Sequence, residues 1–111
     1  MNERMNRYLT EWYDLHGDEV VAMMQDLWEH PELSLHEYHA AQLTGNYMEA
    51  QGFQVEYRAA EDFDNPAAKP NTVIASWGEG KPVIGIIGEL DALPGLGQQA
   101  VPYRAPIEGP G

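Results

Sequence analysis

The chain of 111 residues contains no cysteine, which excludes disulfide bonds and thiolate metal ligands within it. This absence fits a reducing compartment. No stretch resembles a signal peptide or a membrane span, so we expect a cytoplasmic protein. Positive charge is scarce as well: six Lys and Arg residues stand against 18 Asp and Glu, for a net charge of −12. Such a chain lacks the cationic surface that nucleic acid and anionic lipid require, so we expect neither partner.

A phosphate-binding glycine pattern is also missing. No Gly-x-Gly-x-x-Gly run precedes a helix, and Lys81 is followed by Pro82. Hydrophobic residues nevertheless make up 43% of the chain and aromatic residues 10%, which is enough for a folded core. The length allows one domain at most, or a piece of one.

The first predicted helix covers residues 5–28, where apolar residues recur at every third or fourth position. Gly17 is a weak point in it, because glycine costs roughly 1 kcal/mol relative to alanine inside a helix. Pro31 predicts the end of the helix, since the residue before a proline is pushed out of the α region.

A second helix is predicted to follow. Ser34 and Glu37 have the spacing of a capping box at its start, and Gly52 is suited to the left-handed conformation that ends many helices. Apolar residues between these signals lie on one helical face.

Three strands are predicted after the helices. Residues 53–58 alternate between apolar and polar side chains, residues 59–71 form a loop, and residues 72–77 form the second strand. The turn at 78–81 predicts an antiparallel hairpin with a third strand at 83–88, whose lack of alternation predicts burial on both faces. The predicted class is α/β, with two N-terminal helices packed on the first strands of a larger mixed sheet.

The third strand leads directly into two acidic residues, Glu89 and Asp91. In extended backbone they project to the same side. Two close carboxylates can bind a divalent cation, or can raise one pKa by repulsion and act as an acid and base pair. The alternative is a pair of solvated acids at the end of a strand, in a chain that has many.

The four histidines lie on or beside the predicted helices: His16, His30, His36 and His39. The last two are three residues apart, which is compatible with a shared metal, but no further ligand is placed to complete a shell. The favoured interpretation is that all four are surface residues.

Two segments resemble the M20 metallopeptidase and amidohydrolase family. The first is residues 28–34 with Glu37, and the second is residues 71–99, which include Gly-Glu-Leu-Asp-Ala-Leu-Pro-Gly-Leu at 88–96. Within the family the second segment is most similar to the aminobenzoyl-glutamate hydrolase branch.

The resemblance implies a hydrolase that cleaves an amide bond of an N-acyl amino acid or dipeptide with two divalent metals, usually zinc or manganese, and a metal-activated water. It also implies that Asp91 supports the metal site without binding the metal directly. Glu89 stands where many family members have a metal-binding histidine, which leaves its role as a ligand open.

The family's next motif is a His-Gly-Cys-Gly-His run, expected after the Gly- and Pro-rich residues 92–111. The resemblance therefore implies that residues 1–111 are the N-terminal portion of an M20-type catalytic domain, truncated before the metal-ligand motif. We expect this chain alone to be inactive, to hold no metal and to self-associate as a homo-oligomer. The alternatives are a small non-enzymatic α/β interaction module and an acidic metal-buffering protein.

Overall fold

A computed structural model describes residues 2–108. Two compact units make up the chain, Met1–His30 and Pro31–Gly111. The first consists of helix α1, and the second holds helix α2 and a sheet of two strands, β1 and β2. This arrangement confirms the α/β class. In the described part of the chain, neither helix is both long and apolar enough to span a membrane.

Helix α1 (Glu3–Glu29) forms as its apolar periodicity predicts and runs unbroken through Gly17. The Asn2 side chain caps its first turn by accepting a hydrogen bond from the Met5 amide at 2.9 Å. At the other end His30 leaves the helical region, with φ −124° and ψ 61°. This confirms the predicted effect of Pro31 on the residue before it.

Helix α2 (Tyr38–Ala50) ends as predicted but begins differently. Gly52 has φ +92°, its amide bonds to the Glu49 carbonyl at 2.9 Å, and the Phe53 amide bonds to the Met48 carbonyl at 3.1 Å. This is the Schellman arrangement of a left-handed helix end.

The capping box predicted at the start of α2 is wrong. The residue at the cap position is Glu37, whose side chain makes no capping bond, and Ser34 lies outside the helix. Leu35 between them has φ +70°, so the chain turns sharply before α2 begins. A capping box needs the two residues on either side of one continuous first turn, and this turn separates them.

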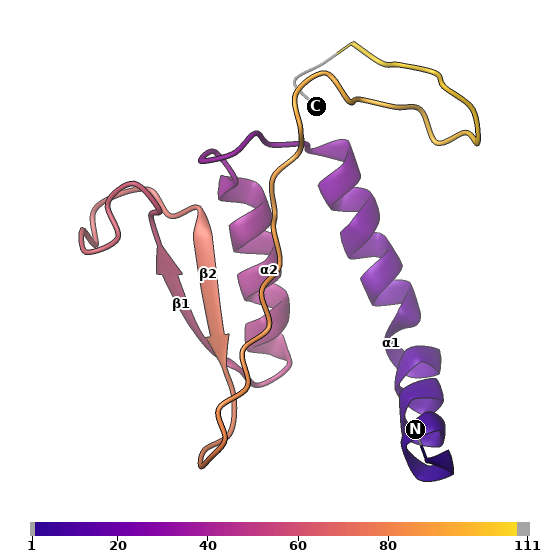
Figure 1. Ribbon diagram of the computed structural model, residues 1–111, viewed down its shortest axis with the longest axis vertical. Coiled ribbons are helices and arrows are strands. Elements are labelled where there is room, and N and C mark those ends of the chain that lie inside the picture. Colours follow the sequence, from indigo (N-terminus) through magenta and orange to yellow (C-terminus); the bar gives the residue numbers. More distant parts are fainter. Residues whose placement is uncertain (1, 109–111) are drawn as a thin grey trace. The chain divides into compact units, whose positions relative to one another are not determined.

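The sheet pairs β1 (Gln54–Arg58) with β2 (Thr72–Ser76) in antiparallel register, from Gln54 opposite Ser76 to Arg58 opposite Thr72. Helix α2 packs on both strands, as Figure 1 shows. The predicted loop at 59–71 connects them.

Small residues let α2 approach the sheet closely. Ala40, Ala41 and Gly45 are buried on the helix. A Cβ atom at Gly45 would overlap the ring of Tyr57 on β1, with the ring carbon Cζ only 2.6 Å away. The missing side chain therefore provides the space that the aromatic ring fills.

Asn71, directly before β2, is the buried polar residue of this unit at 5% exposure. Its side-chain oxygen accepts from the Ala60 amide at 2.8 Å, and its nitrogen donates to the Leu35 carbonyl at 3.0 Å and to Glu61 Oε2 at 3.3 Å. One side chain thus ties the turn before α2 to both ends of the loop between the strands.

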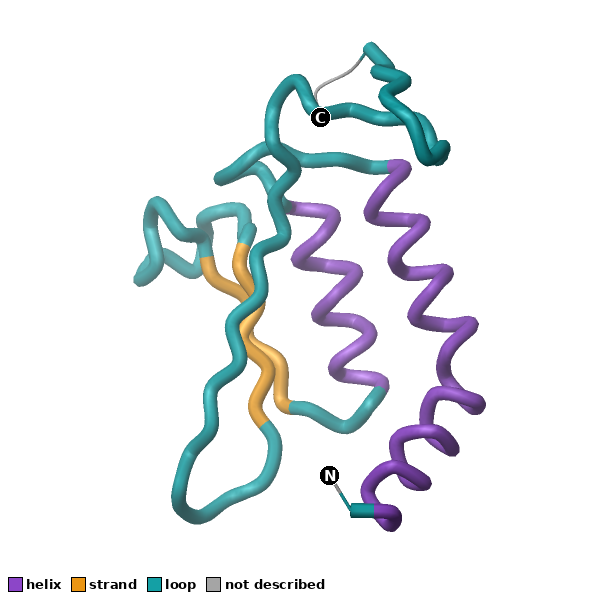
Figure 2. Tube along the Cα trace, turned by 45° about the vertical axis from the view of Figure 1, so that its right-hand side comes forward, coloured by secondary structure: helices purple, strands orange, loops and turns teal. Residues whose placement is uncertain are grey.

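The predicted third strand is not formed. Residues 83–88 are extended but unpaired among the described residues, and Figure 2 draws them as loop. Ile86 and Ile87 are 95% and 94% exposed, so the predicted burial and the hairpin with β2 are both wrong here. β2 pairs with β1 instead, and two glycines at 85 and 88 weaken this stretch as a strand.

The Gly- and Pro-rich end of the described chain folds into a small loop closed by Gln98. Its side-chain nitrogen donates to the carbonyls of Gln99 and Tyr103 at 3.0 and 2.9 Å, and its oxygen accepts from the Ala105 amide at 2.9 Å. Backbone bonds from Gln99 to Ala105 and from Ile107 to Gly97 complete the closure.

Candidate functional site

The acidic pair lies at the end of the unpaired segment. Glu89 is exposed, whereas Asp91 and Ala92 are half-buried. The Ala92 amide donates a hydrogen bond of 2.7 Å to the Glu32 carbonyl, in the segment before α2. The end of the motif is therefore fixed against the chain that enters α2, whereas Glu89 stays in contact with solvent.

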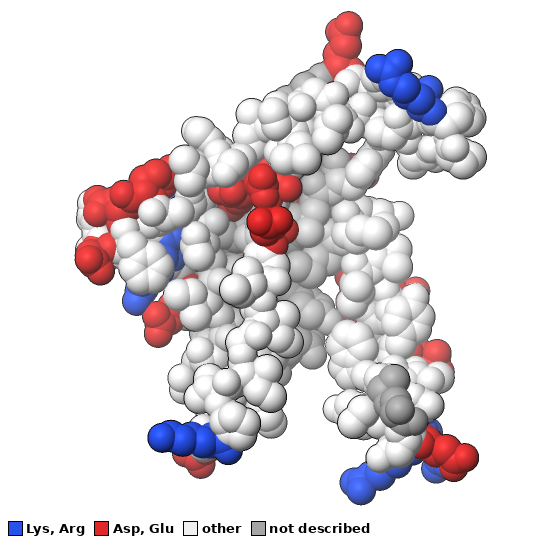
Figure 3. Space-filling view, viewed as in Figure 1, with Lys and Arg blue, Asp and Glu red and all other residues white. Residues whose placement is uncertain are grey.

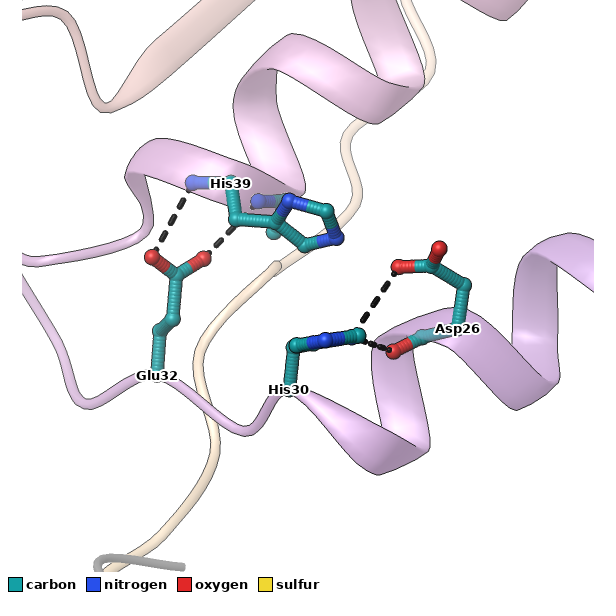
Figure 4. A network of polar contacts seen from close by, with 5 residues as sticks. Asp26, His30, Glu32 and His39 are labelled. Carbon is teal, nitrogen blue, oxygen red and sulfur yellow. Dashed lines mark hydrogen bonds and ion pairs between the residues drawn. The ribbon is translucent and has the colours of Figure 1, made fainter.

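Glu32 has a second set of bonds through its side chain. Oε2 accepts from the His39 amide at 3.0 Å and Oε1 from the Ala40 amide at 2.8 Å. Figure 4 shows the carboxylate directed at the first turn of α2. These amides have no acceptor within their own helix, so Glu32 does what the predicted capping box was expected to do.

The charge on the surface changes along the segment that leads to the motif. Residues 82–88 carry no charge, while Lys81 precedes them and Glu89 follows them. In Figure 3 an uncharged strip runs along this segment between a basic group and acidic groups. Carboxylates at the end of an exposed apolar strip could bind a cation once further ligands joined them.

The described residues do not complete such a ligand set. Between residues 2 and 108, no group of three or more His, Cys, Asp or Glu side chains at metal-binding distance includes Glu89 or Asp91. Whether either carboxylate binds a metal therefore stays a prediction.

His30 is bound to its own helix. Its Nδ1 donates to the Asp26 carbonyl at 2.8 Å and lies 3.3 Å from the Asp26 carboxylate, contacts that Figure 4 also draws. The hydrogen bond to the Asp26 backbone is the largest effect on the pKa of His30 and raises it above its ordinary value of 6.5. Desolvation comes next and opposes this rise in pKa, and the Asp26 side chain and the Glu29 charge add to the rise. The protonated form of His30 thus suits the carbonyl end of α1.

The other histidines also have local partners. His16 Nδ1 lies 3.1 Å from Glu19 Oε2 and its ring stacks near Trp12, with centroids 4.8 Å apart. His36 Nδ1 lies 3.2 Å from the Ser34 carbonyl. His36 belongs to the segment before α2, whereas His39 lies in the first turn of the helix, so the expected spacing on one helix face is not realised.

A pocket of about 380 Å³ lies elsewhere, between the end of β1 and the loop that follows it. Arg58 is one of its lining residues, bonded to Glu56 at 2.9 Å and placed 5.5 Å from the centre of the Phe63 ring. Neither Glu89 nor Asp91 lines this pocket. It contains none of the residues that the sequence singled out.

Comparison with known proteins finds two relatives. Over 98 residues the chain is 34% identical to a p-aminobenzoyl-glutamate hydrolase subunit of Escherichia coli (strain K12), and the match covers 88% of this chain and 19% of that protein. Over 91 residues it is 30% identical to N-acetylcysteine deacetylase of Bacillus subtilis (strain 168), and that match covers 81% of this chain and 22% of the relative.

Both relatives are amidohydrolases of the M20 type, so the resemblance to this class is confirmed over most of the chain. Of the two, the aminobenzoyl-glutamate hydrolase is matched at the higher identity. The chain spans about a fifth of the length of these curated relatives. No family model and no solved structure matches it.

Sequence reasoning missed Glu32 and Asn71. Both positions carried a signal, since a carboxylate directly after Pro31 and an amide directly before an apolar strand are residue types that bond backbone groups. Their partners lie 7 to 36 positions away, however, and no local pattern identifies partners at that range.

Proposed function

We propose that this chain forms part of the catalytic domain of a metal-dependent M20-type amidohydrolase that cleaves the amide bond of an N-acyl amino acid or dipeptide. The observation that carries the proposal is the match to the aminobenzoyl-glutamate hydrolase. Because it spans 98 of 111 residues, residues 14–98 lie inside it wherever it begins. That range includes Glu89 and Asp91.

The substrate class is supported by the names of the two relatives. p-Aminobenzoyl-glutamate and N-acetylcysteine are both amino acids whose nitrogen carries an acyl group. An enzyme related to both is expected to recognise that shared amide and to differ in the pocket for the acyl group. The proposal therefore names the N-acyl amino acid class and no single member of it.

Zinc or manganese is the proposed metal, which would polarise the amide carbonyl and activate water when bound. The described residues fit part of such a site: two carboxylates are present, but no group of three ligands contains them. We propose that Asp91 accepts a hydrogen bond from a metal-binding histidine elsewhere in the longer protein, and that Glu89 is a candidate ligand. On this proposal residues 1–111 alone are inactive.

The test uses the complete reading frame that encodes this chain, loaded with zinc or manganese and assayed on p-aminobenzoyl-glutamate and N-acetyl amino acids. A carboxylate that orients a ligating histidine typically contributes 10- to 100-fold in affinity or activity, so Asp91→Asn should lower kcat/KM by about tenfold or more. Glu79→Gln, in the exposed turn before residue 83, is the matched control and should change little.

Metal content is measured on the same samples. If Asp91→Asn hydrolyses the amide at the unmodified rate with normal metal content, Asp91 is a solvated acid and the proposed role is wrong. If the unmodified protein hydrolyses no amide with either metal, the whole proposal fails.

The interaction module remains the second candidate, favoured by the exposed apolar residues at 83–87. It predicts a reading frame that stops directly after residue 111 and a product without amide hydrolysis. Sequencing beyond this codon together with the assay separates the two proposals.

A further inference from the structure

Glu32 bonds two different parts of its unit at once. Its two carboxylate oxygens accept hydrogen bonds from two backbone amides of α2, those of His39 at 3.0 Å and Ala40 at 2.8 Å. Its backbone carbonyl accepts the Ala92 amide at 2.7 Å. A single residue therefore joins the first turn of α2 to the residue that follows Asp91.

The bond to Ala92 holds a segment that has few other restraints. From residue 78 to residue 96, in the region that the structure describes, this is the one backbone hydrogen bond that reaches another segment. The side chains of the same segment before the motif are largely exposed, as Val83 and Ile84 show at 88% and 81%. The position of Asp91 therefore depends strongly on where the Glu32 carbonyl lies.

The side chain of Glu32 sets the position of that carbonyl. Carboxylate bonds to two helix amides are charge-assisted, and the positive end of the helix dipole favours the negative charge. Asn71 holds the Leu35 carbonyl further along the same segment, but the residues next to Glu32 have no such restraint from a distant part of the described chain. Removing the carboxylate would therefore loosen the chain at Glu32, and its carbonyl would move. The effect on Ala92 is thus transmitted through one residue, from side chain to backbone.

We propose that Glu32 is a positioning residue that fixes Asp91 against the start of α2. For the chemistry this inference rests on the proposed function, because placing Asp91 affects a reaction only if Asp91 supports the metal site. The bond itself is a property of the 111-residue chain and can be tested without any activity.

The first experiment measures amide hydrogen exchange at Ala92 in the 111-residue chain by NMR. Glu32→Ala removes both carboxylate bonds to α2, each of which corresponds to about tenfold or more in a local equilibrium, and the loosened carbonyl should raise the Ala92 exchange rate at least about tenfold. Glu32→Gln keeps one acceptor oxygen, so its Ala92 exchange rate should lie between those of the unmodified chain and Glu32→Ala. Glu37→Ala is the matched control, because the Glu37 side chain makes no capping bond.

The amides of β1 and β2 report whether the variants stay folded. If Glu32→Ala loses sheet protection, the test uses Glu32→Gln instead. The proposal then requires that exchange at Ala92 rises more than exchange at the sheet amides. Unchanged Ala92 exchange in a folded Glu32 variant would overturn the proposal, whatever the enzyme does.

The second experiment uses the complete protein. Glu32→Ala should raise the zinc concentration needed for half-maximal activity by about tenfold, and excess zinc should restore kcat, whereas a variant that merely unfolds would not recover. Faster Ala92 exchange with an unchanged zinc requirement would show that Glu32 positions the segment but that Asp91 does not support a metal. That outcome would contradict the proposed role of Glu32 in the reaction. It is distinguishable from the first overturning result, in which exchange at Ala92 does not change at all.

Discussion

The strand Thr72–Ser76 and residues 83–88 are both rich in valine and isoleucine and are separated by one short turn, yet only the first is part of a sheet. β2 has β1 beside it and α2 on one face. Residues 83–88 have neither among the described residues, and their isoleucines are almost fully exposed. Apolar composition makes a segment suited to a strand, but pairing and cover decide whether it becomes one.

The paired region owes its order to a few polar and small residues. Asn71 bonds the turn before α2 and the start of the loop at 59–71, and Gly45 lets the Tyr57 ring lie against α2. The unpaired region has one such anchor, Glu32, at its far end. Substitutions of Asn71 or Gly45 should therefore make the paired region less ordered, as the unpaired region already is.

The largest effect is expected for Asn71→Ala, which leaves the Ala60 amide and the Leu35 carbonyl without their partner. Both bonds are part-buried, and a shielded group that loses its partner costs roughly 1–3 kcal/mol, so local opening of the sheet should become easier by about 3 kcal/mol. Hydrogen exchange of the β1 and β2 amides measures this free energy. Asn65→Ala, on the exposed loop, is the control and should cost less than about 1 kcal/mol. Equal effects at the two sites would contradict the special role of Asn71.

A smaller loss is expected for Gly45→Ala. The new methyl group would overlap the Tyr57 ring, and overpacking of this kind typically costs about 1–3 kcal/mol, more than the helix propensity gained. Gly17→Ala in α1 is the matched control, since its nearest neighbour is the mostly exposed Tyr13 ring at 3.3 Å. Thermal unfolding should show a lower melting temperature for Gly45→Ala and an unchanged or higher one for Gly17→Ala. A stabilised Gly45→Ala would mean that α2 and β1 do not approach this closely.

The smallest effect concerns the unpaired region, whose exposed apolar strip is expected to make the chain self-associate. Ile86→Lys places a charge in the strip and should weaken association about tenfold or more, the factor that corresponds to burying one large aliphatic side chain. Sedimentation velocity over a range of concentrations measures this. Leu15→Lys, an exposed apolar residue of α1, is the control. An unmodified chain that stays monomeric at every concentration would disprove the expectation.

Most of the local structure was predictable. The apolar spacing in α1, the proline that ends it and the glycine that ends α2 all act through neighbours within four or five positions. Both strands that form were found from their residue types. What failed depended on distant partners: Glu32 replaces the predicted capping box from seven positions away, and β2 pairs with β1 across the loop at 59–71.

The candidate site was predictable only in part. The motif residues Glu89 and Asp91 stand out as acids after an apolar run, and the family resemblance that they carry is confirmed by the relatives. Their roles stay predictions, because a metal site is defined by ligands that converge in space and the described residues supply no third ligand beside them. A sequence names candidate ligands but does not show which of them meet.

The loop closed by Gln98 has a consequence for which substitutions this chain can accept. The position requires two hydrogen-bond donors and one acceptor at the end of a side chain of this length. Glutamate would set an oxygen against two carbonyls, lysine would offer nothing to the Ala105 amide, and asparagine would fall short by one carbon. Sequence tolerance in residues 97–107 should therefore be lowest at position 98, although nothing in the composition of this loop distinguishes that residue from the glutamine beside it.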